Sequence, residues 1–313
     1  MTATPVTDAS GVLPVDKPAG LTSHDVVARV RDLLGVKRVG HSGTLDPMAT
    51  GLLVVLVGSA TRLARFVEAG TKTYEARVVF GVATDTDDAE GIVTATAEVP
   101  GNLTDPALAS AALAALIGPL KQVPPAYAAI KIGGKKAYDL ARAGMAPEMA
   151  PRPVAIHAAR LVAVHAGPPV SWDIALDVSR GTYVRAIARD LGIERGTVAH
   201  LGALRRTAVG SLTLADAIGL DQLLDEGAGT VDTRWADPVA ALGLGAIALT
   251  EREADAVTHG AALRASADAP AEGACVALTA GGRLLAVYRR EGDSLKPDVV
   301  LATPLSLAAE TSA

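Results

Sequence analysis

The chain has little of what several protein classes require. Its 313 residues include a single cysteine, Cys275, so one chain can form neither a disulfide framework nor a zinc site built from cysteines. No apolar run approaches the roughly eighteen residues of a membrane-spanning helix. Met1–Gly11 lacks the basic and apolar regions of a secretory leader. We therefore expect a soluble protein of the reducing cytoplasm.

An excess of positive charge is missing as well. The net charge is −5 and the pI is about 5.7, which argues against a protein that coats nucleic acid nonspecifically. Local basic patches remain compatible with these values, because the field near a site depends on how charge is distributed. Half of the residues are apolar, so the chain can bury a large core in one large domain, alone or with a small one.

The stretch Gly40–Gly58 organises the chain. Its first half predicts an irregular run, punctuated by glycines and Pro47, and its second half, Leu52–Val57, predicts a strand buried on both faces. Asp46 lies in the loop before this strand, and loops held by a rigid scaffold carry many catalytic groups. Asp-Pro is also a common turn pair, so a turn or helix-cap role for Asp46 stays open on this stretch alone.

The segments before this stretch carry clear signals of a strand and a helix. Val12–Val15 predicts a strand, and the following LTSHDVVARVRDLLG has apolar residues at helical spacing. Thr22 or Ser23 can cap the start of that helix, and Gly35 ends it.

Two further stretches alternate as strands do, Thr73–Phe80 and Val170–Val178. Tyr74 shares a face with apolar residues of the first one. The second runs into a helix start, which places Tyr183 and Arg185 in the first helical turn. The helix dipole does not favour a cation there, so a carboxylate partner would account for Arg185; an arginine pointing into solvent is the alternative.

The segments between these strands carry fewer signals. Thr84–Gly91, TDTDDAEG, superficially resembles a calcium loop, but Ala89 occupies the third ligand position, and Ala95 and Thr96 stand where a bidentate glutamate is needed. We expect no metal there, and a turn between two strands. Pro106–Gly118 predicts a helix rich in alanine and leucine.

Basic residues and tyrosines alternate in KQVPPAYAAIKIGGKKAYDLARAG. This composition suits contact with a phosphate backbone and exposed bases, although a solvated basic hairpin without a partner is the alternative. Further along, Ala199–Leu212 adds two more cations. The basic and tyrosine residues concerned are Lys121, Lys131, Lys135, Lys136, Arg142, Tyr127 and Tyr138, together with Arg205 and Arg206.

The motifs, taken together and in order, resemble the bacterial TruB-type tRNA pseudouridine synthases, the family that isomerises uridine 55 in the TΨC loop of tRNA. They are GVLPVDKPAGLTSHDVV, GHSGTLDPMATGLL, KTYEARVVFG followed by TDTDDAEG, PPAYAAIKIGGKKAYDLAR, RGTYVRAIARDLG and ALRRTAVG. Several ordered motifs over roughly residues 11–215 are far more specific than one pattern. The resemblance implies an α+β fold, with a mixed and mostly antiparallel central sheet flanked by helices.

The resemblance also implies the chemistry. The glycosidic bond of uridine breaks and C5 joins C1′, with no group gained or lost, so neither a metal nor an organic cofactor is expected. Asp46 would be the catalytic carboxylate; whether it adds to sugar or base, or takes a proton from C2′, stays open. A carboxyl group among apolar side chains tends toward a raised pKa, which a guanidinium opposes. The resemblance makes Arg185 this partner of Asp46.

A pocket for an extruded base is implied in the same way. Tyr74 would stack on the uracil, Tyr183 and Leu204 would line the pocket, and His41 would help fill the space left by the flipped nucleotide. Lys17 and Asp87 match motif positions that support the pocket. The phosphates of the tRNA T arm would be contacted by Lys131, Lys135, Lys136, Tyr127, Arg142, Arg205 and Arg206.

The resemblance divides the chain into a flexible arm (1–10), a catalytic domain (11–240) with a basic RNA-binding insert (121–152), and a small PUA-like β-rich domain (241–313). In the last, Thr250–His259 predicts a helix, and Cys275–Leu278 and Arg283–Arg289 predict a hairpin. This region is neither strongly basic nor aromatic, so its contact with RNA stays open. We expect a monomer that acts on tRNA without a guide RNA. A noncatalytic tRNA-binding or tRNA-folding protein, and a synthase for another RNA, are the alternatives.

Overall fold

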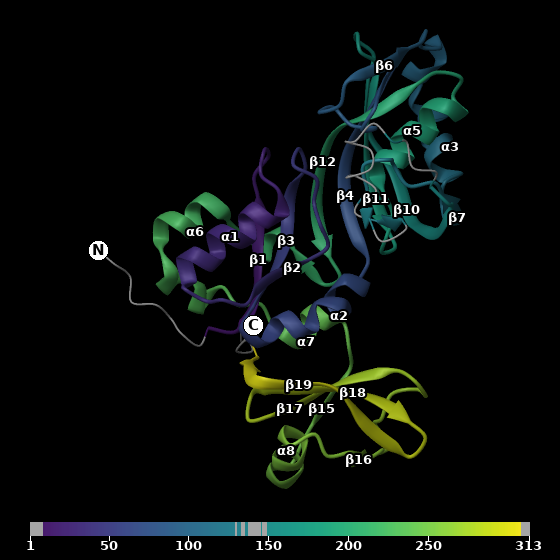
Figure 1. Cartoon of the computed structure of the whole chain (residues 1–313). Coiled ribbons are helices and arrows are strands. Elements are labelled where there is room, and N and C mark those ends of the chain that lie inside the picture. Colours follow the sequence, from purple (N-terminus) through teal and green to yellow (C-terminus); the bar gives the residue numbers. More distant parts are fainter. Residues whose placement is uncertain (1–8, 129, 133–134, 137–144, 146–148, 308–313) are drawn as a thin grey trace. The chain divides into compact units, whose positions relative to one another are not determined.

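A computed structural model describes residues 9–128, 130–132, 135–136, 145 and 149–307 (Figure 1). The chain divides into two compact units. The first consists of Met1–Gly70 and Ala208–Ala313, and the second of Thr71–Thr207. The boundaries predicted at residues 10 and 240 separate an arm, a catalytic domain and a C-terminal domain, which are not the two units found here. These boundaries remain predictions.

The first unit is built around β3 (Thr50–Val57). β1 (Gly11–Lys17) and β2 (Val39–Ser42) both pair with it antiparallel, and β14 (Ile218–Gly219) joins β1 in parallel. Gly51 to Val57 are all buried, which confirms the strand predicted to be buried on both faces. The expectation of an irregular run from Gly40 was wrong for its first three residues, because their main chain pairs with β3 as part of β2.

Helix α1 (Ser23–Leu34) follows β1. Thr22 is its N-cap, in a reciprocal capping box with Asp25, and Gly35 ends the helix in the left-handed conformation with φ of 66°. Both predicted ends are therefore confirmed, and the cap is Thr22 rather than Ser23. The apolar side of α1, including Val26, is buried.

Short elements complete the first unit outside its C-terminal sheet. The last residues of β12 (Ala199–Val209) form a hairpin with β13 (Leu212–Thr213). The helical elements are η1 (Gly58–Leu63), α2 (Ala64–Ala69), η3 (Leu214–Asp216), α6 (Leu220–Glu226), η4 (Ala228–Thr233) and α7 (Pro238–Leu242).

The C-terminal part of the first unit is a five-stranded sheet in the order β15-β17-β18-β19-β16. The strands are β15 (Ala246–Ala248), β16 (Leu263–Arg264), β17 (Cys275–Ala280), β18 (Arg283–Glu291) and β19 (Ser294–Ser306), with helix α8 (Glu251–Thr258) beside them. The predicted helix and hairpin are confirmed. The sheet shares a hydrophobic core with β3 and η1, in which Leu301 and Leu305 pack with Leu56 and Leu63.

Polar contacts join the same elements. Arg62 donates to the carbonyl of Val300, Arg65 forms an ion pair with Asp298, and the N–H of Thr303 donates to Ser59 Oγ at 3.0 Å. The C-terminal sheet is therefore fixed to η1 and α2 by both apolar and polar contacts.

The second unit is a sheet in the order β12-β4-β11-β10-β7. Its other strands are β4 (Lys72–Phe80), β7 (Gly118–Gln122), β10 (Arg152–His165) and β11 (Ser171–Val178). Adjacent pairs from β4 to β7 are antiparallel. Helix α3 (Pro106–Ala114) packs on β10 and α5 (Val184–Glu194) on β4. Trp172 is fully buried, with its ring 4.7 Å from that of Phe80.

The second unit also contains short strands and turns. β5 (Val82–Thr84) and β6 (Val93–Thr96) pair antiparallel, so the turn predicted at Thr84–Gly91 is confirmed. The helix predicted from Pro106 ends at Ala114, earlier than expected, because Gly118 starts β7 with φ of 124°, which does not fit a right-handed helix. A 3-10 turn, η2 (Gly101–Thr104), and a hairpin of β8 (Lys131–Ile132) and β9 (Lys135–Lys136) complete the described elements.

The α+β class, with mixed and mostly antiparallel sheets, is confirmed. Among the described residues, no helix is long and apolar enough to span a bilayer.

Candidate functional site

Asp46 lies in the first unit, half-buried in the loop between β2 and β3. The residues on both sides of it are held by hydrogen bonds. Ser23 Oγ bonds both main-chain polar groups of Leu45, and the carbonyl of Pro47 accepts from the N–H of Gly20 at 2.9 Å. The carbonyl of Asp46 itself accepts from the N–H of Ala49 at 3.1 Å. The carboxylate therefore projects from a loop whose backbone is fixed.

Lys17, at the end of β1, is fully buried. Its Nζ donates to the carbonyls of Pro18 at 2.9 Å, Leu21 at 2.7 Å and Pro47 at 3.1 Å. The ammonium group thus joins three chain segments, and one of its acceptors directly follows Asp46. This geometry lets Lys17 brace the loop that carries Asp46, and its support of a substrate pocket stays a prediction.

His41 lies on β2, also in the first unit. Its ring meets that of His24, an exposed residue in the first turn of α1, edge to face with centroids 5.6 Å apart and planes at 82°. The pair places two imidazoles near the start of α1.

In the second unit, Arg185 is the second residue of α5 and is 5% exposed. Its guanidinium donates to the carbonyls of Thr86 and Tyr127, both at 3.0 Å. Oδ2 of Asp88 lies 3.6 Å from Nη1 of the same group. Arg185 is therefore a buried cation that ties α5 to the turn after β5 and to the segment after β7.

Sequence reasoning chose Asp87 in this turn and missed Asp88. Asp87 has a positive φ of 61°, and its carboxylate pairs with Arg189 at 3.0 Å. Asp88 is 4% exposed and accepts from Thr86 Oγ1 at 2.6 Å and from the N–H of Glu90 at 3.1 Å. Spacing alone could not separate the two adjacent aspartates, because the left-handed backbone at Asp87 determines which carboxylate approaches Arg185.

Burial raises the pKa of Asp87, and the guanidinium groups of Arg189 and Arg185 oppose this rise. Arg189 also donates to the carbonyl of Val123 at 2.9 Å, so it connects the Asp87 turn to the first residues of the predicted basic insert.

The residues expected to line a pocket are largely buried. Tyr74 on β4 and Leu204 on β12 are each 8% exposed. Tyr183 is the N-cap residue of α5, and the amide of Gln122 bonds both its N–H, at 2.8 Å, and its carbonyl, at 3.1 Å. Sequence reasoning missed Gln122, which carries no motif signal. All these residues belong to the second unit.

The predicted RNA contacts are placed unevenly. Lys131, Lys135 and Lys136 lie on the β8–β9 hairpin, whereas Arg142 lies outside the described residues. Arg205 is half-buried on β12. Arg206 is only 1% exposed, so expecting it to touch a phosphate was wrong for this structure.

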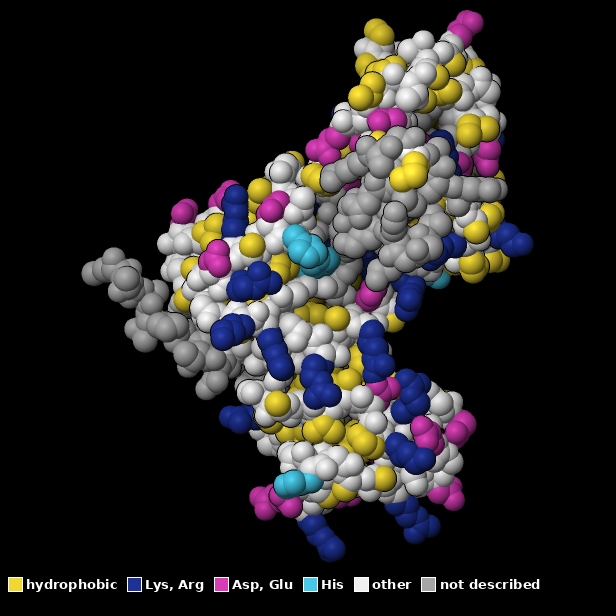
Figure 2. All heavy atoms as spheres, in the orientation of Figure 1, with side chains coloured by type: hydrophobic (Ala, Val, Ile, Leu, Met, Phe, Trp, Pro, Cys, Tyr) yellow, Lys and Arg dark blue, Asp and Glu magenta, His cyan; other side chains and the backbone are white. Residues whose placement is uncertain are grey.

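Tyr127 is half-buried, and its hydroxyl faces Asp85 Oδ2 at 3.4 Å. Figure 2 shows Lys and Arg side chains on the first unit too, where Arg29, Lys37, Arg38 and Arg62 are exposed. Cations are thus not confined to the predicted insert.

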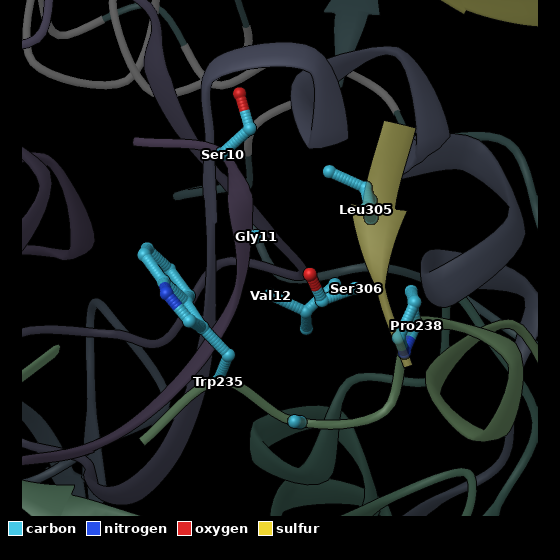
Figure 3. Close-up of a pocket in the computed structure, with 8 residues that line it drawn as sticks. Ser10, Gly11, Val12, Trp235, Pro238, Leu305 and Ser306 are labelled. Atoms are coloured by element: carbon cyan, nitrogen blue, oxygen red, sulfur yellow. The ribbon is translucent and has the colours of Figure 1, made fainter. Parts of the chain in front are cut away.

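A small cavity of about 70 Å³ lies in the first unit between β1, the segment before α7, and the end of β19 (Figure 3). Trp235, Val12 and Leu305 line it, and none of the predicted site residues does. In the described part of the chain, no three His, Cys, Asp or Glu side chains are grouped as metal ligands would be.

Comparison with known proteins shows the family of the chain, which the geometry of the site alone does not. The chain is 43% identical over 298 residues to the tRNA pseudouridine synthase B of Mycobacterium sp. (strain KMS), covering 95% of this chain and 97% of that relative. The chain belongs to the TruB family of pseudouridylate synthases. Residues 31–184 match the N-terminal domain of TruB family pseudouridylate synthases. The resemblance carried by the sequence motifs is confirmed.

Other parts of the chain match the same family. Residues 185–237 match the tRNA pseudouridylate synthase B C-terminal domain, and residues 244–302 match the C-terminal part of tRNA pseudouridine synthase II. Among further TruB relatives, tRNA pseudouridine synthase B of Nocardia farcinica is 44% identical over 292 residues, 93% of each chain. That of Gluconacetobacter diazotrophicus is 42% identical over 303 residues, 93% of this chain and 97% of the relative.

Solved structures share the TruB fold at lower identity. A chain of a Cbf5-Nop10-Gar1 complex superposes with a TM-score of 0.71 at 23% identity, covering 93% of this chain and 84% of that one. A chain of an H/ACA RNP bound to a substrate RNA containing 2′-deoxyuridine gives 0.69 at 21% identity, covering 94% and 85%. These likenesses concern the fold alone.

Proposed function

We propose that the chain isomerises uridine 55 to pseudouridine in the TΨC loop of tRNA. The observation that carries this proposal is the 43% identity, over 95% of the chain, to a protein named tRNA pseudouridine synthase B. The reaction moves one glycosidic bond from N1 to C5 of the same uracil, so the protein must supply binding, orientation and acid–base chemistry.

Asp46 is the catalytic carboxylate in this proposal, acting on the sugar or base of the target uridine. Its fixed loop supports the assignment, because a catalytic group must be held close to its productive geometry. Arg185 keeps Asp46 ionised, and Asp88 holds Arg185 in place. Arg185 suits this role because its guanidinium is buried and already oriented by two carbonyls.

Extrusion of the target base accounts for the aromatic residues of the proposed pocket. Unstacking a base costs a few kcal/mol, and stacking on an aromatic ring returns about 1–3 kcal/mol per base. Tyr74 stacks on the flipped uracil, Tyr183 and Leu204 line the pocket, and His41 helps fill the space that the nucleotide leaves. Lys17 and Asp87 are supports of the pocket in this proposal.

Binding of the T arm relies on phosphate contacts from the basic insert. Lys131, Lys135, Lys136 and Arg142 supply these contacts with Arg205 and Tyr127, and the chain acts as a monomer without a guide RNA. Because such contacts release counterions, affinity for tRNA falls steeply as salt rises.

The experiment is a direct assay. The purified protein is incubated with an unmodified T-arm hairpin and no other RNA, and pseudouridine is mapped chemically. Asp46→Asn is compared with Asp32→Asn, an exposed aspartate of α1. We expect product from the wild type and from Asp32→Asn, and none from Asp46→Asn.

Other results separate the alternatives. Binding without product in the wild type would indicate a noncatalytic tRNA-binding or tRNA-folding protein. Product only after a guide RNA is added would contradict guide-free action. Product from Asp46→Asn at the wild-type rate would move the catalytic role to another residue.

A further inference from the structure

Helix α1 contributes a buried hydroxyl to the loop that carries Asp46. Ser23 is the first residue of α1 and is 1% exposed. Its Oγ accepts from the N–H of Leu45 at 2.9 Å and donates to the carbonyl of Leu45 at 3.1 Å. One side chain thus satisfies both main-chain polar groups of the residue directly before Asp46.

Ser23 is available for this contact because it does not cap the helix. Thr22 accepts from the N–H of Asp25, and the Asp25 carboxylate accepts from the N–H and the hydroxyl of Thr22. The helix start is therefore satisfied without Ser23. Its hydroxyl is committed instead to a loop 22 residues further along the chain.

The anchor is rigid as well as close. α1 is capped at both ends and buries its apolar side. Ser23 therefore ties the Asp46 loop to a packed helix rather than to another loop. On the other side of Asp46, the carbonyl of Pro47 accepts from Lys17 and Gly20. Asp46 is thereby held between two fixed neighbours, and Ser23 supplies both side-chain hydrogen bonds at Leu45.

We propose that Ser23 is a positioning residue for Asp46, whose hydroxyl fixes the backbone at Leu45 and so aims the carboxylate. It touches no substrate. The proposal rests on the proposed function of Asp46, because the direction of its carboxylate matters for the rate only if that carboxylate takes part in the reaction. A displacement of about 1 Å at a catalytic group can lower a rate on the order of a hundredfold.

The test compares Ser23→Ala with Ser59→Ala. Ser59 is also buried in the first unit and also accepts a main-chain N–H, but that N–H belongs to Thr303 of β19 and not to the Asp46 loop. Single-turnover rates are measured at saturating enzyme on the T-arm hairpin. Dissociation constants are measured with the same two substitutions in an Asp46→Asn background, where no product forms.

We expect Ser23→Ala to lower the single-turnover rate on the order of 10- to 100-fold with an unchanged dissociation constant. Ser59→Ala should leave both quantities near those of its parent. A wild-type rate in Ser23→Ala, or a loss confined to the dissociation constant, would overturn the proposal. So would an equal loss of rate in Ser59→Ala, because that would reflect general destabilisation.

Hydrogen exchange tests the clamp without using activity. In Ser23→Ala, amides of peptides covering residues 43–49 should exchange faster, while those of β3 and the second half of α1 keep their protection. Unchanged exchange over residues 43–49 would overturn the proposal. If the wild type formed no pseudouridine, the proposed function would fail, and this measurement would still decide whether Ser23 holds the loop.

Discussion

Replacing Lys17 by methionine should strongly destabilise the first unit. Met fills a similar volume, so the change removes the ammonium without leaving a large cavity. The carbonyl of Pro47 keeps the N–H of Gly20, but those of Pro18 and Leu21 lose their bonds to Nζ. An unsatisfied buried polar group costs about 1–3 kcal/mol, so the two carbonyls, which belong to half-buried residues, together give a loss of at most roughly 2–6 kcal/mol.

The variant no longer buries a charged ammonium group, and this gain offsets part of the loss. We therefore expect a loss of unfolding free energy in the lower half of the range. Urea unfolding of Lys17→Met and wild type gives the difference, provided that the m-value stays constant. Lys296→Met is the matched control, since Lys296 is exposed and pairs with Glu291 on the surface at 2.6 Å. If Lys17→Met unfolded at the wild-type urea concentration, the three-carbonyl clamp would contribute no stability, and the reasoning would be refuted.

Three more predictions concern single side chains. Asp88→Asn, which removes the charge facing Arg185, should lower the pseudouridine-forming rate on the order of tenfold and more than Asp87→Asn does; equal effects in single-turnover assays would contradict the placement of Asp88. The Arg77 guanidinium, with His165, lowers the pKa of Asp173 to about 2, below its unfolded value of about 3.9. Its stabilisation is therefore complete above about pH 4 and is lost as the pH falls toward 2. Asp173→Asn should flatten the pH dependence of the unfolding free energy in that interval, and an unchanged slope would count against the pair. A Cβ on Gly11 would lie 2.4 Å from the Trp235 ring, so Gly11→Ala should cost about 1–3 kcal/mol and shift the tryptophan fluorescence, unlike Gly245→Ala, which meets nothing within 4 Å.

Local patterns were enough for the elements around Asp46. Leu52–Val57 has no polar residue that could face water, so a strand buried on both faces was the consistent prediction. Thr22 and Gly35 mark the ends of α1 through cap geometry that involves only neighbouring residues. Signals of this kind are complete within one turn of helix or one strand, and sequence reasoning can therefore use them.

Contacts between distant segments could not be found in this way. Ser23 was one of two candidate caps, and only the folded chain shows its hydroxyl bonded to Leu45. Asp87 and Asp88 are equivalent in spacing, and the backbone conformation at Asp87 separates them. Arg206 looked like an accessible cation beside Arg205, but the alternation of β12 turns it into the interior. In each case the sequence showed the residue type but not the direction in which the side chain or carboxylate points.

The discontinuity of the first unit has a consequence for synthesis. β1 pairs with β14 through Val15 and Ile218, so the sheet beside Asp46 lacks a neighbour until the ribosome has passed the whole second unit. The second unit is continuous, from Thr71 to Thr207, and can fold as soon as it emerges. At about 5–20 residues per second, the N-terminal strands wait on the order of ten seconds for their C-terminal partners. A chain released late in that interval, after Arg185 but before Ile218, would contain Asp46 and Arg185, yet it would lack the strand and the C-terminal sheet against which the first unit packs.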